Sequence, residues 1–241
     1  MNEAALECLM EEARTSHEAE KKFVHALLDS RVYTHVPLSD DHPRLRLIMF
    51  QHPDGFMAIP FFTSLKKAQF ANRGAARIIS TTGRDLLEGS NGATLMLNPN
   101  DGGMVLYPEE VSTLLGTGFW SRVQREDYSE GPQRYIWPPS DVPAWFIDDL
   151  RKACESLGMV VSGHLAEMAY TEHATVRSLL IVLQVLTEQG ERAARALTLR
   201  LQQGGKLEQL NRSLDITILD PNAEPPNWLE SEGLQFYPVL N

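Results

Sequence analysis

Two groups of side chains in this sequence have the residue types that bind metal ions. The first is the polar run NPNDGG, in which Asn98, Asn100 and Asp101 supply oxygen atoms of the kind that calcium prefers. A calcium loop of the EF-hand type also needs acids at alternating positions and a distal glutamate, and the proline between the two asparagines interrupts that pattern. A phosphate-binding loop would need a lysine followed by serine or threonine at the start of a helix, which the run lacks. It therefore predicts a tight hairpin loop, with Gly102 and Gly103 at positive φ.

The second group is His164, Glu167 and His173, whose side chains are ordinary zinc ligands. The surrounding stretch, residues 159–170, has the pattern of a strand, in which positions three apart lie on opposite faces. His164 and Glu167 would then face apart, which argues against a zinc site. The sequence also lacks HExxH, CxxC and GxSxG motifs, so we expect no metal, no cofactor and no catalytic activity.

Large aromatic rings gather around a polar, proline-containing stretch in the middle of the chain. This stretch, residues 121–140, is rich in turn-forming residues, and the rings in or beside it belong to Trp120, Tyr135, Trp137 and Trp145. Two interpretations stay open. The rings are either buried between two domains, or they line a cleft in which a partner binds through aromatic anchors.

A second candidate binding surface is the helix predicted for residues 188–203. Arg192 and Arg195 make this helix locally basic in a chain whose formal net charge is −10. A solvated helix face and a patch for an acidic partner both fit this pattern. We therefore add the two arginines to the aromatic residues as candidate partner-binding positions.

Charge and composition argue against several classes of function. The negative net charge, without clustered lysine and arginine, argues against binding to nucleic acid or to an anionic membrane. The longest aliphatic run, residues 179–186, is far shorter than the roughly 20 apolar residues of a membrane-spanning helix. The first residues are acidic where an export signal is basic. Two cysteines far apart in sequence, Cys8 and Cys154, suit free thiols in a reducing compartment, so we expect a cytoplasmic protein.

The apolar patterns predict an α+β protein of two domains, each with a mixed or antiparallel sheet flanked by helices. We expect a first domain over residues 1–120, an aromatic, proline-containing joint over 121–140 and a second domain over 141–241. One long helix or two short ones are expected between residues 3 and 29. The strands are expected at residues 31–36, 45–50, 56–62, 75–80, 93–98, 104–107, 159–170, 176–186, 214–220 and 234–240.

The order of several short segments resembles the enhanced serine sensitivity (SseB) family. For the N-terminal domain of that family, the segments are FVHALLDSRVYTHVPL, MAIPFFTSLKKAQFA, GATLMLNPNDG and LYPEEVSTLL. The strands EMAYTE, RSLLIVLQVL and LDITILD and a closing FY are similar to its C-terminal domain. The resemblance implies a cytosolic bacterial protein, named for a phenotype of serine sensitivity, without an established active site.

The residues and the resemblance together favour a non-catalytic binding or regulatory protein with a protein partner. One alternative is an immunity or chaperone-like protein that occludes a toxin or effector, where the acidic balance would suit a basic partner. Another alternative is an enzyme or sensor for a small molecule of amino-acid metabolism. A neighbouring toxin gene would favour the first alternative, and a metabolic operon would favour the second.

Overall fold

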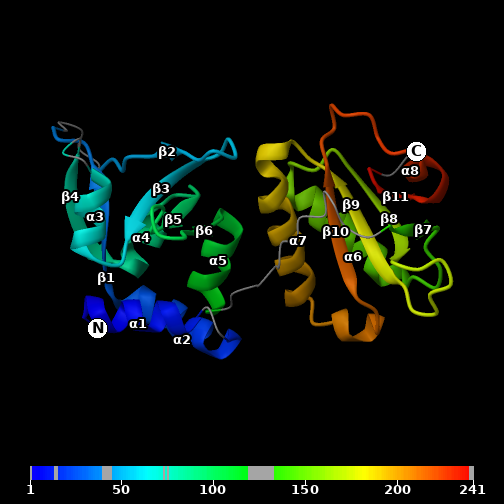
Figure 1. The fold of residues 1–241 in the computed structure, drawn as a ribbon, viewed down its shortest axis with the longest axis horizontal. Helices are drawn as coiled ribbons and strands as arrows, with labels where there is room; N and C mark the ends of the chain where they lie inside the picture. Colours follow the sequence, from blue (N-terminus) through cyan, green and yellow to red (C-terminus); the bar gives the residue numbers. More distant parts are fainter. Residues whose placement is uncertain are drawn as a thin grey trace. The chain divides into compact units, whose positions relative to one another are not determined.

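A computed structural model describes residues 2–13, 16–39, 45–72, 74, 76–118 and 133–238. The chain divides into two compact units, Met1–Trp120 and Ser121–Asn241. Each unit contains one mixed β-sheet with helices packed on it (Figure 1). The predicted α+β class is therefore confirmed. No helix within the described ranges is long and apolar enough to cross a membrane.

The first unit begins with helices and then builds a sheet from strands that are not consecutive in the chain. Its elements are α1 (Glu3–Ala13), α2 (His17–Asp29), β1 (Arg31–Val36), β2 (Phe50–Gln51), β3 (Met57–Phe62), α3 (Leu65–Asn72), β4 (Arg77–Thr82), α4 (Gly83–Gly89), β5 (Leu95–Leu97), β6 (Met104–Leu106) and α5 (Pro108–Thr117). The strand order is β4-β1-β3-β5-β6, with β2 beside β3. β3 and β5 run parallel, and the other neighbours run antiparallel.

Local sequence explains where the helices of this unit begin. Ser16 caps α2 by accepting a backbone N–H of the first turn at 3.2 Å. Thr82 caps α4 in the same way, by accepting the N–H of Asp85 at 3.1 Å, as the sequence predicts. Pro108 takes the first position of α5, where its missing N–H costs nothing, and the acids after it lie at the positive end of the helix dipole. Two helices, rather than one, therefore precede β1.

The core of the first unit lies between four helices and the sheet. Its buried apolar residues on the helices are Leu6, Phe23, Val24, Leu27, Leu28, Leu86, Leu87, Val111 and Leu114. They pack against Val32, Ile59, Phe61, Leu95, Leu97 and Leu106 of the strands. Helix α3 contacts β1 separately, through the His35 ring nitrogen and the Ala68 carbonyl oxygen at 2.9 Å.

The expected strand over residues 45–50 is wrong for most of its length. Only Phe50 lies in a strand, β2, which pairs antiparallel with the start of β3. The Ile48 N–H donates to the His35 carbonyl at 3.0 Å. One backbone hydrogen bond does not make a strand. The alternating apolar residues here are therefore partly buried without being paired with a neighbouring strand.

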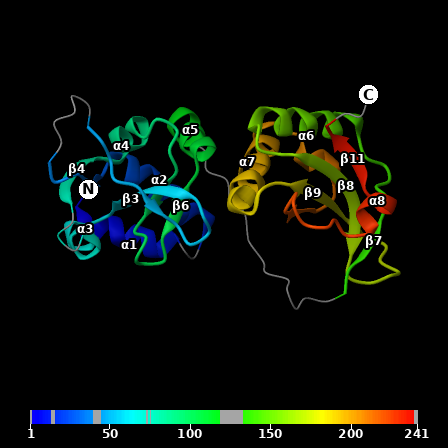
Figure 2. The same ribbon diagram turned by 90° about the horizontal axis from the view of Figure 1, so that it is seen from above.

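The second unit contains a βαβ crossover and three further strands that pair antiparallel. Its elements are β7 (Tyr135–Trp137), α6 (Ala144–Leu157), β8 (Ser162–Ala169), β9 (Ser178–Gln184), η1 (Thr187–Gln189), α7 (Gly190–Gln203), η2 (Leu207–Leu210), β10 (Leu214–Leu219), α8 (Trp228–Glu232) and β11 (Leu234–Tyr237). The strand order is β10-β9-β8-β11, and β7 pairs with β8. Figure 2 shows β7, β8, β9 and β11 of this unit from above. β9 and β10 are parallel, as their connection through α7 requires.

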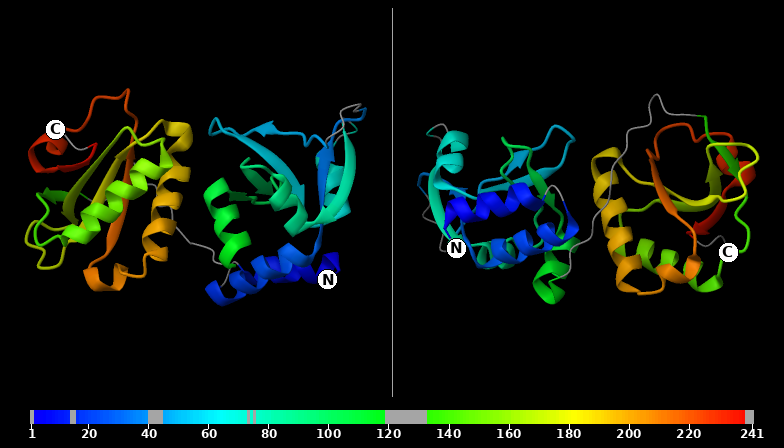
Figure 3. Two further views of the ribbon diagram at one scale, coloured as in Figure 1. Left: turned by 180° about the vertical axis from the view of Figure 1, so that it is seen from behind. Right: turned by 60° about the horizontal axis from the view of Figure 1, so that its bottom comes forward.

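Helices cover both faces of the second sheet, but unequally. Helices α6 and α7 pack on one face, as Figure 3 shows for α6, and bury Phe146, Leu150, Cys154 and Leu197 against the strands. The opposite face has a smaller cluster of Ala166, Met168, Leu180, Val182 and Leu229, with Ile136 of β7 at its margin. Cys154 is fully buried and is a core residue.

Two elements of this unit differ from the sequence expectations. Residues 135–137, expected in the joint, form β7 and pair with Ala169, Met168 and Glu167. The helix α8 was not expected because two prolines precede it. Proline is, however, compatible with a helix start, and the Leu229 N–H bonds to the Pro226 carbonyl at 2.9 Å.

Candidate functional site

The short strand β7 brings two of the predicted aromatic residues together. Tyr135 and Trp137 are two positions apart, so both side chains lie on the same face of the sheet, while Ile136 joins the apolar cluster on the other. Their rings stack with centroids 6.2 Å apart and an interplanar angle of 25°. Both residues are partly exposed. The strand thus displays an ordered aromatic pair at one end of the sheet.

Two arginines reach the same end of the sheet from neighbouring parallel strands. Arg177 and Arg212 each stand two residues before a leucine, and the register aligns Leu179 with Leu214. The triplet Arg-Ser-Leu therefore occurs twice, side by side. The two serines between them lie 2.8 Å apart through their hydroxyl oxygens, and Nε of Arg212 donates to the Arg177 carbonyl at 3.2 Å.

Glu167 of β8 holds the two arginines together. Its carboxylate Oε1 accepts Nη2 of Arg212 at 2.8 Å, and Oε2 accepts Nη1 of Arg177 at 3.3 Å. Oε1 also accepts the backbone N–H of Ser140 at 2.8 Å and its hydroxyl at 2.7 Å. The Glu167 side chain is only 2% exposed. A buried carboxylate remains charged when hydrogen-bond donors and opposite charges surround it, and Glu167 has both.

The pKa of Glu167 reflects this environment. Burial alone would raise its pKa, because a charged carboxylate loses hydration in the protein interior. The hydrogen bonds from Ser140 and Arg212 and the charge of Arg212 outweigh that effect and lower the pKa to about 2. Glu167 is therefore ionised at neutral pH and acts as the anchor of the cluster.

Arg177 links this anchor to the aromatic pair. Its guanidinium carbon lies 3.9 Å from the centroid of the Trp137 ring, the geometry of a cation–π contact. The Arg177 side chain is nevertheless 32% exposed. We name Tyr135, Trp137 and Arg177 the β7 surface.

The other predicted binding residues lie elsewhere. Trp145 packs against the core of α6 and α7, with its ring 5.8 Å from Phe146. Arg195 lies on α7 and pairs with Glu191 one turn earlier at 3.2 Å, and Arg192 lies on the same helix. Trp120 falls outside the described residues. The structure thus joins Tyr135 and Trp137 with two arginines and a glutamate that the site prediction did not include.

The three side chains considered as zinc ligands, those of His164, Glu167 and His173, do not converge on one site in the described part of the chain. In β8, His164 lies on the opposite face from Glu167, whose carboxylate belongs to the arginine cluster. Burial lowers the pKa of His164, which favours its neutral form. Among the residues that the structure describes, no three histidine, cysteine, aspartate or glutamate side chains come together as metal ligands do.

The NPNDGG run turns the chain between β5 and β6. Asn98 is only 2% exposed and ties the loop to the end of β3. Its Oδ1 accepts the Thr63 N–H at 3.1 Å, and its Nδ2 donates to the Thr63 hydroxyl at 3.1 Å. Asp101 pairs with Lys67 at 3.0 Å, and Lys67 also binds Glu7 of α1 at 2.9 Å. The polar atoms of the loop thus bind other parts of the unit.

The glycines of this loop follow the prediction only in part. Gly102 has a φ of 64°, as predicted, and Asn98 also adopts a positive φ of 47°. Gly103 does not have positive φ, so that part of the prediction is wrong. A side chain at Gly103 is excluded for another reason, because its Cβ would lie 2.7 Å from Cε of Met96 and 3.0 Å from the Leu97 carbonyl oxygen.

The first unit also has an open polar cavity of about 790 Å³. Its lining residues are Asn2, Glu3, Leu6, Asp29, Ser30, Arg31, Tyr33, Ser80, Thr81, Thr82 and Asp85. The acids are already engaged in part, since Glu3 accepts the Tyr33 hydroxyl at 2.6 Å and Asp85 accepts the Thr82 hydroxyl at 2.6 Å. The cavity therefore presents hydroxyls and internal hydrogen bonds more than open charge.

Comparison with known proteins finds similarity both for the first unit alone and for most of the chain. The model of the SseB protein N-terminal domain matches residues 6–113, almost the whole first unit. Two proteins, each named Protein SseB, from Escherichia coli (strain K12) and Shigella flexneri, are 27% identical to the chain over 175 residues. The match covers 70% of this chain and 68% of each relative. The first unit is thus similar to the SseB protein N-terminal domain, and most of the chain is similar to the two SseB proteins. No solved structure matches the chain.

The resemblance to SseB predicted from sequence is therefore confirmed. The first unit accounts for 120 of the 241 residues, so a match over 70% of the chain must extend into the second unit. The matched domain model, however, is that of the N-terminal domain alone. The assignment of the second unit to the C-terminal domain of SseB stays a prediction.

A signal for the missed arginines is present in the sequence. The triplet Arg-Ser-Leu at 177–179 recurs at 212–214, each time at the start of an apolar strand. If the two strands are taken as parallel neighbours in register, the triplets place both arginines side by side. Glu167 carries no comparable signal, since its partners Ser140, Arg177 and Arg212 come from three different segments of the chain.

Proposed function

We propose that this chain is a non-catalytic, cytoplasmic binding protein of the SseB family, and that a protein partner docks on the β7 surface. The observation that carries the proposal is the partly exposed pair Tyr135 and Trp137 with Arg177 stacked on the tryptophan. Tyrosine, tryptophan and arginine are the residue types that contribute most of the binding energy at protein interfaces. Trp137 contacts both of the others, the Tyr135 ring and the Arg177 guanidinium, so the three form a compact anchor group.

The order of these side chains supports the same role. A side chain that is already held in one conformation loses less entropy when a partner binds. Trp137 is stacked by Tyr135, and Arg177 is fixed by Glu167 on one side and by the Trp137 ring on the other. The β7 surface is thus preorganised before any partner arrives.

Two further exposed apolar side chains lie at the same end of the sheet. Tyr135 pairs with Ala169, and the next residue along β8, Tyr170, is 45% exposed. Val176, which precedes Arg177, is 79% exposed. Neighbouring exposed apolar side chains of this kind are typical of sites where proteins interact.

The proposal is tested by affinity purification of variants from the native host. Trp137→Ala removes the central ring of the β7 surface, and we expect it to weaken capture of the partner by about 2 kcal/mol or more, roughly thirtyfold. Phe70→Ala is the matched control, because Phe70 is a 75% exposed ring in the first unit. It should capture the partner as well as the unchanged protein does.

A denaturant melt of each variant separates binding from folding. We expect the free energy of unfolding to fall by about 1 kcal/mol for Trp137→Ala, because the ring is partly exposed already. If Trp137→Ala and Phe70→Ala capture the same proteins in the same amounts, the β7 surface is not the docking site. A loss of about 3 kcal/mol or more in stability would instead identify Trp137 as a core residue.

A further inference from the structure

We propose that Arg177 is the receptor for a carboxylate, supplied by an aspartate or glutamate side chain in an extended acidic segment of the partner. This inference rests on the proposed docking at the β7 surface and specifies its chemistry.

The two guanidinium groups differ in how many of their donors are occupied. Arg212 uses all three nitrogens: Nε on the Arg177 carbonyl, Nη1 on the Ser140 carbonyl and Nη2 on Glu167. Arg177 uses only Nη1, on Glu167. Within the described ranges, Nε and Nη2 of Arg177 have no hydrogen-bond partner, and neither atom is among the buried polar atoms without one. They therefore face solvent.

The free donors of Arg177 have the geometry of a carboxylate receptor. Nε and Nη2 lie on the same edge of the guanidinium plane and point in parallel, the arrangement that binds both oxygens of a carboxylate at once. Glu167 and the Trp137 ring fix the plane from two other sides. The receptor is therefore oriented in advance, which reduces the entropic cost of binding.

The charge balance also favours one added negative charge. Two arginines share one carboxylate, because Glu167 is the only acid that pairs with Arg177 or Arg212 in the described part of the chain. The cluster therefore carries one excess positive charge within a chain of net charge −10. A single carboxylate would neutralise it.

A phosphate group fits this site less well. A phosphate monoester carries nearly two negative charges at neutral pH and is usually held by more than one cation or by several donors. Arg212 cannot turn toward such a ligand without giving up its bonds to Ser140 and Glu167. One free pair of donors on one arginine matches the two oxygens of a carboxylate.

The test is a selection of short random peptides, displayed without a free C-terminus, on the immobilised full-length protein. We expect the selected peptides to share an aspartate or glutamate. Calorimetry then compares one selected peptide with its amide counterpart, in which that acid is replaced by asparagine or glutamine. Removing either the peptide carboxylate or the arginine, by Arg177→Gln, should lower affinity about tenfold or more, and removing both should cost little beyond either change alone.

Two further variants supply a second test of the paired donors and a control. Arg177→Lys preserves the charge but loses the paired donors, so it should also lower affinity, and it covers the case in which Arg177→Gln does not fold. Arg151→Gln is the matched control, because Arg151 is 30% exposed and pairs with Asp148 at 3.0 Å. It should bind the peptide as the unchanged protein does.

The outcomes separate this inference from the proposed docking surface. Peptides that share no acid but lose binding on Trp137→Ala would overturn the carboxylate receptor and leave the docking surface in place. Acidic peptides that bind Arg177→Gln as tightly as the unchanged protein would also overturn it. A selection that yields no peptide whose binding depends on Arg177 would also overturn the carboxylate receptor. Docking at the β7 surface is tested separately, by whether Trp137→Ala still captures the native partner.

Discussion

Glu167→Gln is the substitution whose effect the structure defines most fully. The variant keeps the size of the side chain and one carbonyl oxygen but removes the negative charge. Arg177 and Arg212 would then lie side by side without the carboxylate that joins them. The two guanidinium groups would repel each other in this partly buried cluster. They would also lose their strongest hydrogen bonds, those to the carboxylate.

The size of the effect follows from the pKa of Glu167. Folding lowers this pKa from its ordinary value of 4.5 to about 2. At about 1.4 kcal/mol for each pKa unit, the charged form contributes roughly 3 kcal/mol to the free energy of unfolding at pH 7. The side chain is 2% exposed, so solvent screening reduces this figure little. We therefore expect Glu167→Gln to lower the free energy of unfolding by about 3 kcal/mol.

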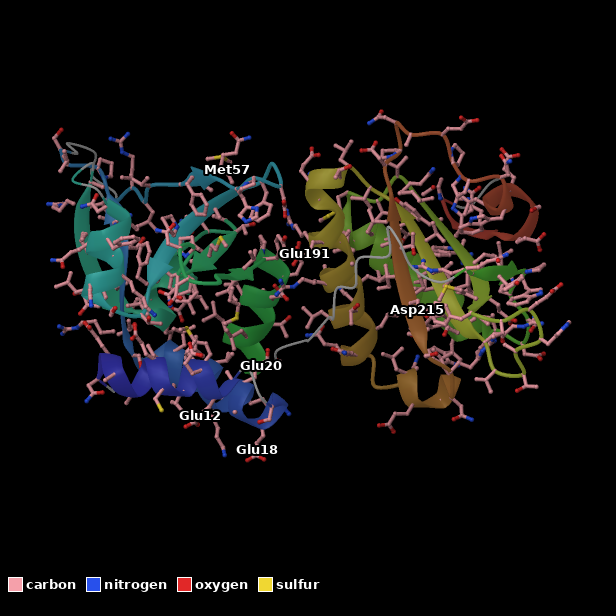
Figure 4. The ribbon with its side chains drawn as sticks, viewed as in Figure 1. Glu12, Glu18, Glu20, Met57, Glu191 and Asp215 are labelled. Carbon is pink, nitrogen blue, oxygen red and sulfur yellow. The ribbon has the colours of Figure 1, made fainter. Side chains whose placement is uncertain are left out.

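The pH dependence gives an independent check on this magnitude. Because the pKa falls on folding, the stabilisation is present above the unfolded value of about 4.5 and is lost as the pH falls toward 2. Urea melts of the unchanged protein and of Glu167→Gln should therefore differ most at pH 7 and converge below pH 4. Glu18→Gln is the control, since Glu18 is 81% exposed on α2 (Figure 4) and should show no measurable change.

Either of two results would refute the account of Glu167. A cost below about 1 kcal/mol at pH 7 would show that the cluster does not depend on the buried charge. A cost that stays constant between pH 7 and pH 3 would show that the destabilisation comes from shape or packing and not from the carboxylate.

Three further substitutions or reactions test other parts of the structure. Asn98→Ala should lower the free energy of unfolding by about 2 kcal/mol in a urea melt, because it leaves a buried N–H without a partner and places alanine at a positive φ of 47°. Gly163→Ala should lower the melting temperature, because its Cβ would lie 2.5 Å from the Phe236 ring, whereas Gly158→Ala meets no atom within 4 Å and should cost only the strain of positive φ. An aromatic disulfide reagent should modify Cys8 in the native protein and Cys154 only after unfolding, because burial raises the pKa of Cys154 to about 12.

Much of the fold could be predicted from sequence, because many of its signals are local. The caps at Thr82 and Pro108, and the apolar face of α6 that ends at Gly158, lie within one or two turns of the helix they define. The short helix α8 and the loss of the strand before Phe50 were missed. In both cases tertiary contacts decide the outcome, and a short apolar or proline-containing run is compatible with more than one structure.

The candidate site was only partly predictable for a related reason. Tyr135 and Trp137 are two residues apart, so any strand places their rings on one face. Arg177, Arg212 and Ser140 meet Glu167 only after four segments have paired in a definite register. Register is a long-range property, and the repeated Arg-Ser-Leu triplet points to it only once the two strands are known to be parallel neighbours.

The proposed docking at the β7 surface is tested most directly by photo-crosslinking in the native host. A photoreactive phenylalanine analogue placed at Trp137 should form a discrete covalent adduct with a partner protein on illumination. The same analogue at Phe70, a 75% exposed position in the first unit, should form none. An adduct at position 137 alone is the predicted result. No adduct at either position, or the same adducts at both, would contradict docking at the β7 surface.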